Sequence, residues 1–184
     1  MAIFIMWITP ISWWMKINID VVALGAPGPS VYGGIFHTHR GFIKGFFYNF
    51  IGSGVAIEDE LWAMVKAIRY AIYHGRKDLW METKSTLAVD ILRSFRFFLW
   101  RTLSSWIDNH RFVDQLCIIV TQVYIEVNRV TDALSKIAIK EAKSVWSFVT
   151  PTFFSELVEA NARGDVYTHL CNFPLQLLLC CLYF

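Results

Sequence analysis

The chain has 184 residues, of which 55% are apolar, 16% aromatic and 17% charged. This composition excludes an intrinsically disordered chain, and the length allows one domain with or without a tail. The formal net charge of +2 is too small for a polycation, so any nucleic-acid-binding surface must come from local clustering of basic residues.

Both ends of the chain are apolar, but neither resembles a membrane-spanning or secretory segment. Residues 1–15 lack a basic start and contain Pro10, which is unlike a signal peptide. The final run, PLQLLLCCLYF, is about half as long as the roughly 20 residues that a spanning helix needs. The four cysteines include no CxxC pair, so neither a zinc site nor a disulfide framework is expected. We therefore expect an intracellular protein without a membrane span, and we leave the compartment and the oligomeric state open.

Three stretches near the start of the chain predict strands. Residues 14–24 (WMKINIDVVAL) alternate between polar residues, from Lys16 to Asp20, and apolar neighbours, which is the period of a strand with two unlike faces. After a turn rich in Gly and Pro, residues 31–38 (VYGGIFHT) predict a second strand and residues 42–48 (FIKGFFY) a third. The short loops between these strands require an antiparallel meander.

The rest of the pattern predicts helices that alternate with strands. Apolar residues from Leu61 to Ile72 recur at helical spacing. They predict a helix over residues 57–74, which ends at Gly75. The other expected elements are strands over 78–83 and 116–124 and helices over 85–93, 95–107 and 128–143. Ser85 is expected to cap the helix that follows it. This order predicts a mixed α/β fold with a five-stranded sheet, its first three strands antiparallel, and helices on both faces.

Five motifs in this order resemble one known family. They are WWMKINID at residues 13–20, GAPGPSVYGGIFHTHRGFIKGF at 25–46, EDELWAMVKAI at 58–68, LWMETKST at 79–86 and NRVTDALSKIA at 128–138. Together they are similar to type 1 ribonuclease H domains of the reverse-transcriptase-like, plant retroelement-related kind. The resemblance implies a ribonuclease H-like domain over 13–143, preceded by an N-terminal extension over 1–12 and followed by an apolar tail over 144–184 without an assigned role.

The resemblance also implies a metal-dependent site made of carboxylates. In that family, four acids from separate elements hold two Mg²⁺ ions. Only clustered anionic oxygens can keep two divalent cations about 4 Å apart beside a scissile phosphate. Asp20, Glu60 and Asp132 match three of the four positions, which makes them the expected metal ligands and catalytic residues.

The fourth position departs from the family pattern. Lys84 stands where the motif has an acid, so an ammonium group would repel the metal ions. Glu82 shares its strand face and is the candidate to substitute, but it lies about 6.6 Å back along the strand. Gln122 stands where the family has a mobile histidine, and an amide cannot carry a proton in its place. These changes predict a degenerate site with impaired cleavage.

Three functions therefore stay open. The first is a working RNA/DNA-hybrid ribonuclease that uses the three matched acids with help from Glu82. The second is a nucleic-acid-binding module with a silent centre, which would recognise the hybrid by its shape; Trp100 and Arg101 lie where relatives grip it. The third is a decayed retroelement-derived product, or an interaction protein whose apolar tail binds a partner.

Overall fold

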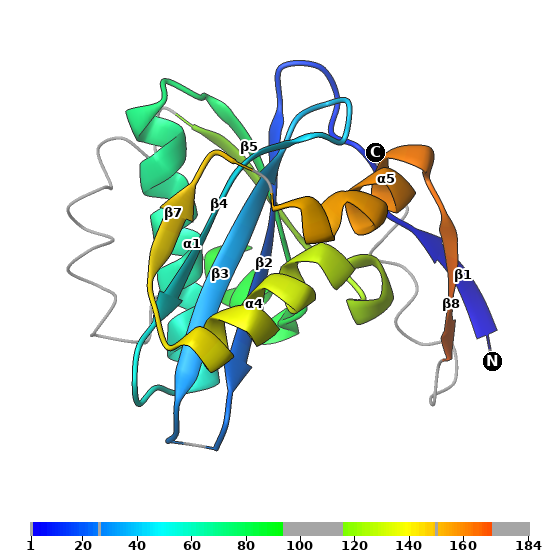
Figure 1. The fold of residues 1–184 in the computed structure, drawn as a ribbon. Helices are drawn as coiled ribbons and strands as arrows, with labels where there is room; N and C mark the ends of the chain where they lie inside the picture. The colour runs from blue at the N-terminus through cyan, green and yellow to red at the C-terminus, as the bar shows by residue number, and fades with distance from the viewer. Residues whose placement is uncertain (1, 26, 94–115, 150, 171–184) are drawn as a thin grey trace.

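The largest element of the fold is a six-stranded mixed sheet with helices on both faces (Figure 1). The structure is a computed structural model that describes residues 2–25, 27–93, 116–149 and 151–170. The strand order in the sheet is β6-β5-β2-β3-β4-β7. These strands are β2 (Met15–Ala23), β3 (Ser30–His37), β4 (Ile43–Phe50), β5 (Asp78–Thr83), β6 (Cys117–Gln122) and β7 (Val145–Ser147). Strands β2, β3 and β4 form the predicted antiparallel meander, β5 runs parallel to β2, and β6 runs parallel to β5.

Each face of this sheet is covered by its own helices. The helices are α1 (Ala56–Tyr73), α2 (Thr86–Arg93), α4 (Arg129–Glu141) and α5 (Ser155–Arg163). Ile17 and Ile19 of β2 are fully buried in a core that α1 and α2 complete. On the opposite face, Val130 and Leu134 of α4 pack against apolar residues of β3 and β4, and α5 lies beside α4. Apolar side chains at the predicted helical spacing thus close the core on both sides.

The predicted mixed α/β fold is confirmed, with one strand more than expected in the main sheet. Strand β5 has the predicted bounds, and Ser85 caps α2 as expected, because its Oγ accepts a hydrogen bond of 3.1 Å from the backbone N–H of Ala88. The sixth strand, β7, pairs antiparallel with β4. Its three residues are too few to give a periodic signal, which explains why the prediction stopped at five strands. The helix expected over 95–107 lies outside the described residues, as do Trp100 and Arg101.

A second, two-stranded sheet joins the two ends of the described chain. Strand β1 (Ala2–Met6) pairs antiparallel with β8 (Val166–Leu170). Directly after β1, the side chain of Trp7 is 3% exposed and packs with Val123 and Val127. Residues before and after the motif-bearing region therefore contribute to the packed interior.

Both faces of β2 are buried. The side chains of Lys16, Asn18 and Asp20 point to the α4 side, and each residue is at most 2% exposed. The alternation along this strand predicts two unlike faces, yet the polar face is covered because α4 and the segment around Trp7 lie over it. Three buried polar groups must therefore find partners within the protein.

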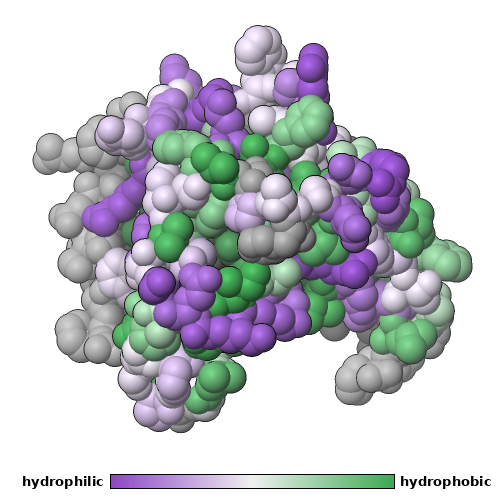
Figure 2. All heavy atoms as spheres, viewed as in Figure 1, coloured by the Kyte–Doolittle hydropathy of each residue, from purple (hydrophilic) through white to green (hydrophobic). Residues whose placement is uncertain are grey.

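Helix α4 presents a hydrophilic outer side. On the face drawn in Figure 2, hydrophilic residues form a band where α4 lies in Figure 1. Its exposed residues are Arg129, Lys136, Lys140 and Glu141. Among the helices of the described ranges, none has the length and hydrophobicity needed to cross a bilayer.

Candidate functional site

Asp20 and Lys84 form an ion pair on the α4 side of the sheet. Asp20 lies on β2 opposite Gly33 of β3. Lys84 directly follows β5, whose register sets Glu82 level with Asn18 and so brings Lys84 level with Asp20. The distance from Lys84 Nζ to Asp20 Oδ1 is 2.6 Å; the Asp20 side chain is fully buried, and that of Lys84 is 29% exposed. The cation at the fourth acidic position thus pairs directly with the first acid.

The ion pair partly offsets the effect of burial on Asp20, whose pKa stays above its ordinary value. Burial raises the pKa of Asp20, because the carboxylate loses its hydration, and the negative charge of Asp132 raises it further. The ammonium group of Lys84 acts in the opposite direction and lowers it. Lys84 therefore stabilises the anionic form of Asp20 in the interior.

Glu60 brings a second carboxyl group to this region from α1. The residue is 6% exposed, and its Oε1 accepts a short hydrogen bond from the hydroxyl of Thr83, the last residue of β5. Burial raises the pKa of Glu60 to about 8; the charge of Asp20 adds to this rise and that of Lys84 reduces it. Glu60 is consequently mostly protonated at pH 7.

Asp132 lies in the first turn of α4 and pairs with a lysine on its own helix. Its Oδ2 is 2.6 Å from the Nζ of Lys136, one turn further along. The start of α4 is fixed to β2 by Asn128, which is buried and donates a hydrogen bond of 3.0 Å from Nδ2 to the carbonyl oxygen of Ile19. The sequence pattern predicts Asn128 only as the beginning of a helix. Its position in the same motif as Asp132 was the available signal for this anchoring role.

Glu82 is held by a buried network away from Lys84. Its Oε1 lies 2.9 Å from Lys16 Nζ, and its Oε2 accepts a hydrogen bond of 2.9 Å from Asn18 Nδ2. Lys16 is fully buried, with its Nζ 4.3 Å and 4.1 Å from the ring centroids of Trp7 and Trp80. If Glu82 turned toward Lys84, it would leave the ammonium of Lys16 buried without its counter-ion, which is strongly unfavourable.

Gln122 contacts the backbone of Lys84. It is the last residue of β6, is exposed, and donates a long hydrogen bond of 3.5 Å from Nε2 to the carbonyl oxygen of Lys84. The position where the family has a mobile histidine therefore lies next to the substituted acidic position.

The three predicted acids influence one another but form no ligand cluster. Asp20 is coupled electrostatically to both Glu60 and Asp132. Within the part of the chain that the structure describes, however, no three His, Cys, Asp or Glu side chains lie close enough to hold a metal ion. Asp20 is paired with Lys84, Glu60 is largely protonated near neutral pH, and Asp132 is paired with Lys136. These residues do not fit a pair of Mg²⁺ ions, which require several free anionic oxygens.

Comparison with known sequences gives one distant relative and no family assignment. No protein-family model matches the chain. A protein of Arabidopsis thaliana named "Putative ribonuclease H protein" is 26% identical over an alignment of 171 residues, and the match covers 86% of this chain. The chain spans only about a quarter of that relative, 26% of its length.

Comparison with solved structures identifies the fold. The ribonuclease H1 of the halophilic archaeon Halobacterium salinarum matches 70% of this chain and 98% of its own, with a TM-score of 0.60 and 21% identity. LC11-RNase H1, solved in complex with an RNA/DNA hybrid, matches the same shares with a TM-score of 0.61 and 18% identity. LC9-RNase H1 matches 83% of this chain and 86% of its own, with a TM-score of 0.63 and 15% identity. The chain therefore has the ribonuclease H fold.

Proposed function

We propose that this chain is a ribonuclease H-type domain that binds RNA/DNA hybrids and whose hydrolytic centre Lys84 disables. The fold, the similarity to a protein named as a ribonuclease H, and a structural neighbour solved with an RNA/DNA hybrid support the first part. The five sequence motifs suggest descent from a plant retroelement, and the match to a protein of Arabidopsis thaliana supports the plant part of this proposal. The observation that carries the second part is the 2.6 Å ion pair between Lys84 and Asp20.

The strength of this ion pair opposes metal binding at Asp20. Opposite unit charges 2.6 Å apart attract by about 1.6 kcal/mol in water and about 6 kcal/mol at an effective dielectric constant of 20. The partial exposure of Lys84 places its interaction between these limits. A divalent cation would have to displace the ammonium group, or bind beside it against direct repulsion.

The other two acids add to this obstacle. Since the pKa of Glu60 is about 8, its carboxyl group would have to lose a proton before it could act as an anionic ligand. That loss requires on the order of 1 kcal/mol at pH 7. Asp132 would have to leave its ion pair with Lys136. We therefore expect weak affinity for Mg²⁺ and little or no cleavage.

Two other functions are outcomes that experiment can recognise. A working nuclease would need Glu82 to replace the missing acid, which its contacts with Lys16 and Asn18 oppose. A protein-interaction module is favoured by the exposed apolar side of the β1–β8 sheet, where Phe4 is 79% and Leu170 is 69% exposed.

Hybrid binding is tested by fluorescence anisotropy with a labelled RNA/DNA hybrid and with double-stranded DNA of the same sequence. We expect tighter binding to the hybrid, with an affinity that falls steeply as salt is added, because phosphate contacts release counterions. Equal affinity for both duplexes would reject recognition of the hybrid, and no binding to either would reject the proposal and favour the interaction module.

Cleavage is tested on the same hybrid with Mg²⁺ in the wild type and in Lys84→Asp. We expect the substitution to raise the cleavage rate by at least about 100-fold, since it replaces a repelling charge by a ligand. Lys77→Asp, an exposed position that precedes the same strand at its other end, makes the same change in charge and should have no such effect. A wild-type rate equal to that of Lys84→Asp would show that Lys84 alone does not disable the centre.

A further inference from the structure

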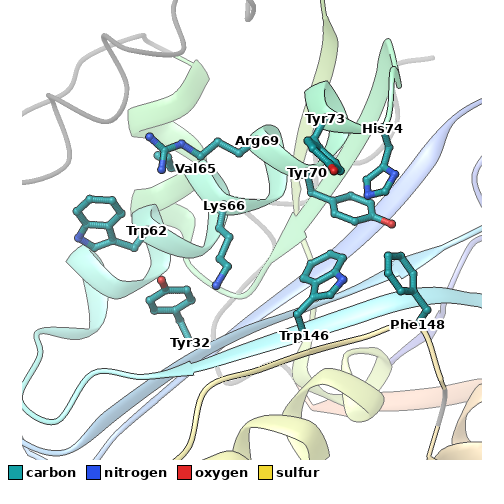
Figure 3. A pocket seen from close by; sticks show the side chains of 10 residues that line it. All are labelled: Tyr32, Trp62, Val65, Lys66, Arg69, Tyr70, Tyr73, His74, Trp146 and Phe148. Atoms are coloured by element: carbon teal, nitrogen blue, oxygen red, sulfur yellow. The ribbon is translucent and has the colours of Figure 1, made fainter.

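An aromatic groove lies on the opposite face of the sheet from Asp20. It has a volume of about 530 Å³ and runs between α1, strand β3 and the segment around β7. Six aromatic side chains line it: Tyr32, Trp62, Tyr70, Tyr73, Trp146 and Phe148. Figure 3 shows Trp62 and Tyr32 at one end of the groove, and Trp146 and Phe148 toward the other. Tyr32 packs on the α1 side of the sheet, whereas the side chain of Asp20 points to the α4 side.

All charged side chains that line this groove in the described structure are basic. Lys66 points from α1 into the space between the two aromatic ends, and Arg69 lies on the exposed side of the same helix (Figure 3). A second hollow of about 540 Å³ adjoins the first through shared lining residues and adds Lys44 and Arg76. Four cations thus accompany the aromatic surface, and no acid among the described residues lines either hollow.

The aromatic floor of the groove is held in place by its own packing. The ring of Trp146 lies 4.4 Å from that of Tyr70 and is stacked 5.8 Å from that of Phe47, centroid to centroid. Tyr73 and Phe148, by contrast, are 85% and 56% exposed. A fixed ring flanked by exposed rings offers a stacking surface without rearrangement of the core.

Lys66 is the cation best placed to receive an anion in the groove. Its Nζ donates a short hydrogen bond to Asn49 and lies 5.3 Å from the ring centroid of Phe47. Burial lowers the pKa of Lys66, because the ammonium group has lost part of its hydration. A phosphate group nearby would stabilise the charged form.

We propose that this groove binds single-stranded nucleic acid, with bases stacked on the aromatic rings and phosphates near the basic residues. Stacking on aromatic rings beside cations is the general mode by which single strands are bound without sequence preference. An apolar protein segment could pack against the rings, but it would make no favourable electrostatic interaction with the four cations. A duplex keeps its bases paired and cannot stack them on protein rings.

The length of the groove suits a short run of nucleotides. Trp62 and Tyr73 are eleven residues apart on α1, which corresponds to about 16 Å at a rise of 1.5 Å per residue. This span holds about five stacked nucleotides at 3.4 Å each. The groove is independent of the Lys84 site, so it can act whether or not the protein cleaves hybrids.

The test measures the affinity of the full chain for fluorescent 12-nucleotide oligo(U) and oligo(dT) by anisotropy. Tyr73→Ala removes an exposed ring and Arg69→Glu reverses an exposed charge, so neither should unfold the protein. We expect each to weaken binding at least about tenfold. The matched controls are Trp13→Ala, at a residue that is 87% exposed outside the groove, and Lys140→Glu on α4; both should bind as the wild type does. Comparing the two oligonucleotides shows whether the 2′-hydroxyl contributes.

Photo-crosslinking with oligonucleotides that carry 5-iodouracil gives a second readout by locating the contact through mass spectrometry. Crosslinks to Tyr73, Trp62 or Phe148 are expected. The proposal is overturned if the groove variants and the controls bind equally, or if the crosslinks map elsewhere. A loss of binding on Lys140→Glu as large as that on Arg69→Glu would also overturn it. If the Tyr73→Ala variant alone loses affinity and added salt has no effect, the groove would suit an apolar partner instead.

Discussion

The Glu60→Gln substitution tests the electrostatic description of the acidic site without disturbing its packing. Glutamine has nearly the same shape as glutamic acid, and its side-chain carbonyl can still accept the hydrogen bond from Thr83. It cannot ionise. The variant therefore reproduces the protonated form of Glu60 at every pH, and its difference from the wild type isolates the ionisation of this one buried group.

The expected magnitude follows from the pKa of Glu60 in the two states. Its value is about 8 in the folded protein and 4.5 in the reference state, so between these values the folded protein holds the additional proton. A raised folded pKa gives stability that is complete below pH 4.5 and lost as the pH rises through 8. Relative to acidic pH, the loss is about 3 kcal/mol at pH 7 and about 5 kcal/mol at pH 9.

Urea unfolding between pH 4.5 and pH 9 measures this loss. The free energy of unfolding of the wild type should fall with pH more steeply than that of Glu60→Gln, and the variant should be the more stable protein above pH 8. Glu156→Gln, an exposed position on α5, makes the same chemical change and should follow the wild type. If the Glu60→Gln and wild-type curves stay parallel over this range, Glu60 is not the buried, proton-binding group described above.

Three further predictions concern the contacts around the site. Lys16→Met leaves Glu82 buried without its cation and should lower the free energy of unfolding by about 3–5 kcal/mol. The double variant Lys16→Met/Glu82→Leu should recover much of this loss. Urea unfolding measures both variants, and equal losses of stability would show that the two residues are not coupled. Asn128→Ala removes the donor to the Ile19 carbonyl and should lower the free energy of unfolding by about 1–3 kcal/mol. Hydrogen exchange should then become faster in the first turn of α4, and unchanged rates there would refute the anchoring role. Ser85→Ala should lower the free energy of unfolding by about 1 kcal/mol, and Ser85→Asp should restore it. Thermal unfolding measures both variants. If Ser85→Ala leaves the stability unchanged, this cap contributes nothing to it.

The sequence predicts the elements of the fold well where a local pattern has a local cause. Helical spacing along α1 reflects the apolar face that it turns to the core, and alternation along β2 reflects one apolar and one polar face, so both are visible in the residues themselves. Ser85 was identified as a cap because capping needs only the residues that directly follow it. Strand β7 depends instead on pairing with β4, almost a hundred residues earlier in the chain, and its three residues carry no period of their own.

The candidate site was predictable only as far as its motifs reach. The positions of Asp20 and Lys84 follow from the motifs, and strand register then brings the two side chains to the same level. The burial of Lys16 could not be predicted, because its partners come from two other segments: Trp7 before β2, and Trp80 and Glu82 on β5. A lysine in an alternating strand is ordinarily expected in solvent.

The carbonyl oxygen of Ile8 accepts a hydrogen bond of 2.6 Å from the buried Nζ of Lys16. The residues that precede β2 therefore cover the interior of the main sheet at Lys16. Truncating the protein to its motif-bearing stretch, residues 13–143, would expose to water a lysine that is fully buried in the native protein. Such a truncated product should express poorly or aggregate. If the truncated protein failed in a binding or cleavage assay, the failure would reflect the loss of the covering residues. It would give no information about the native protein.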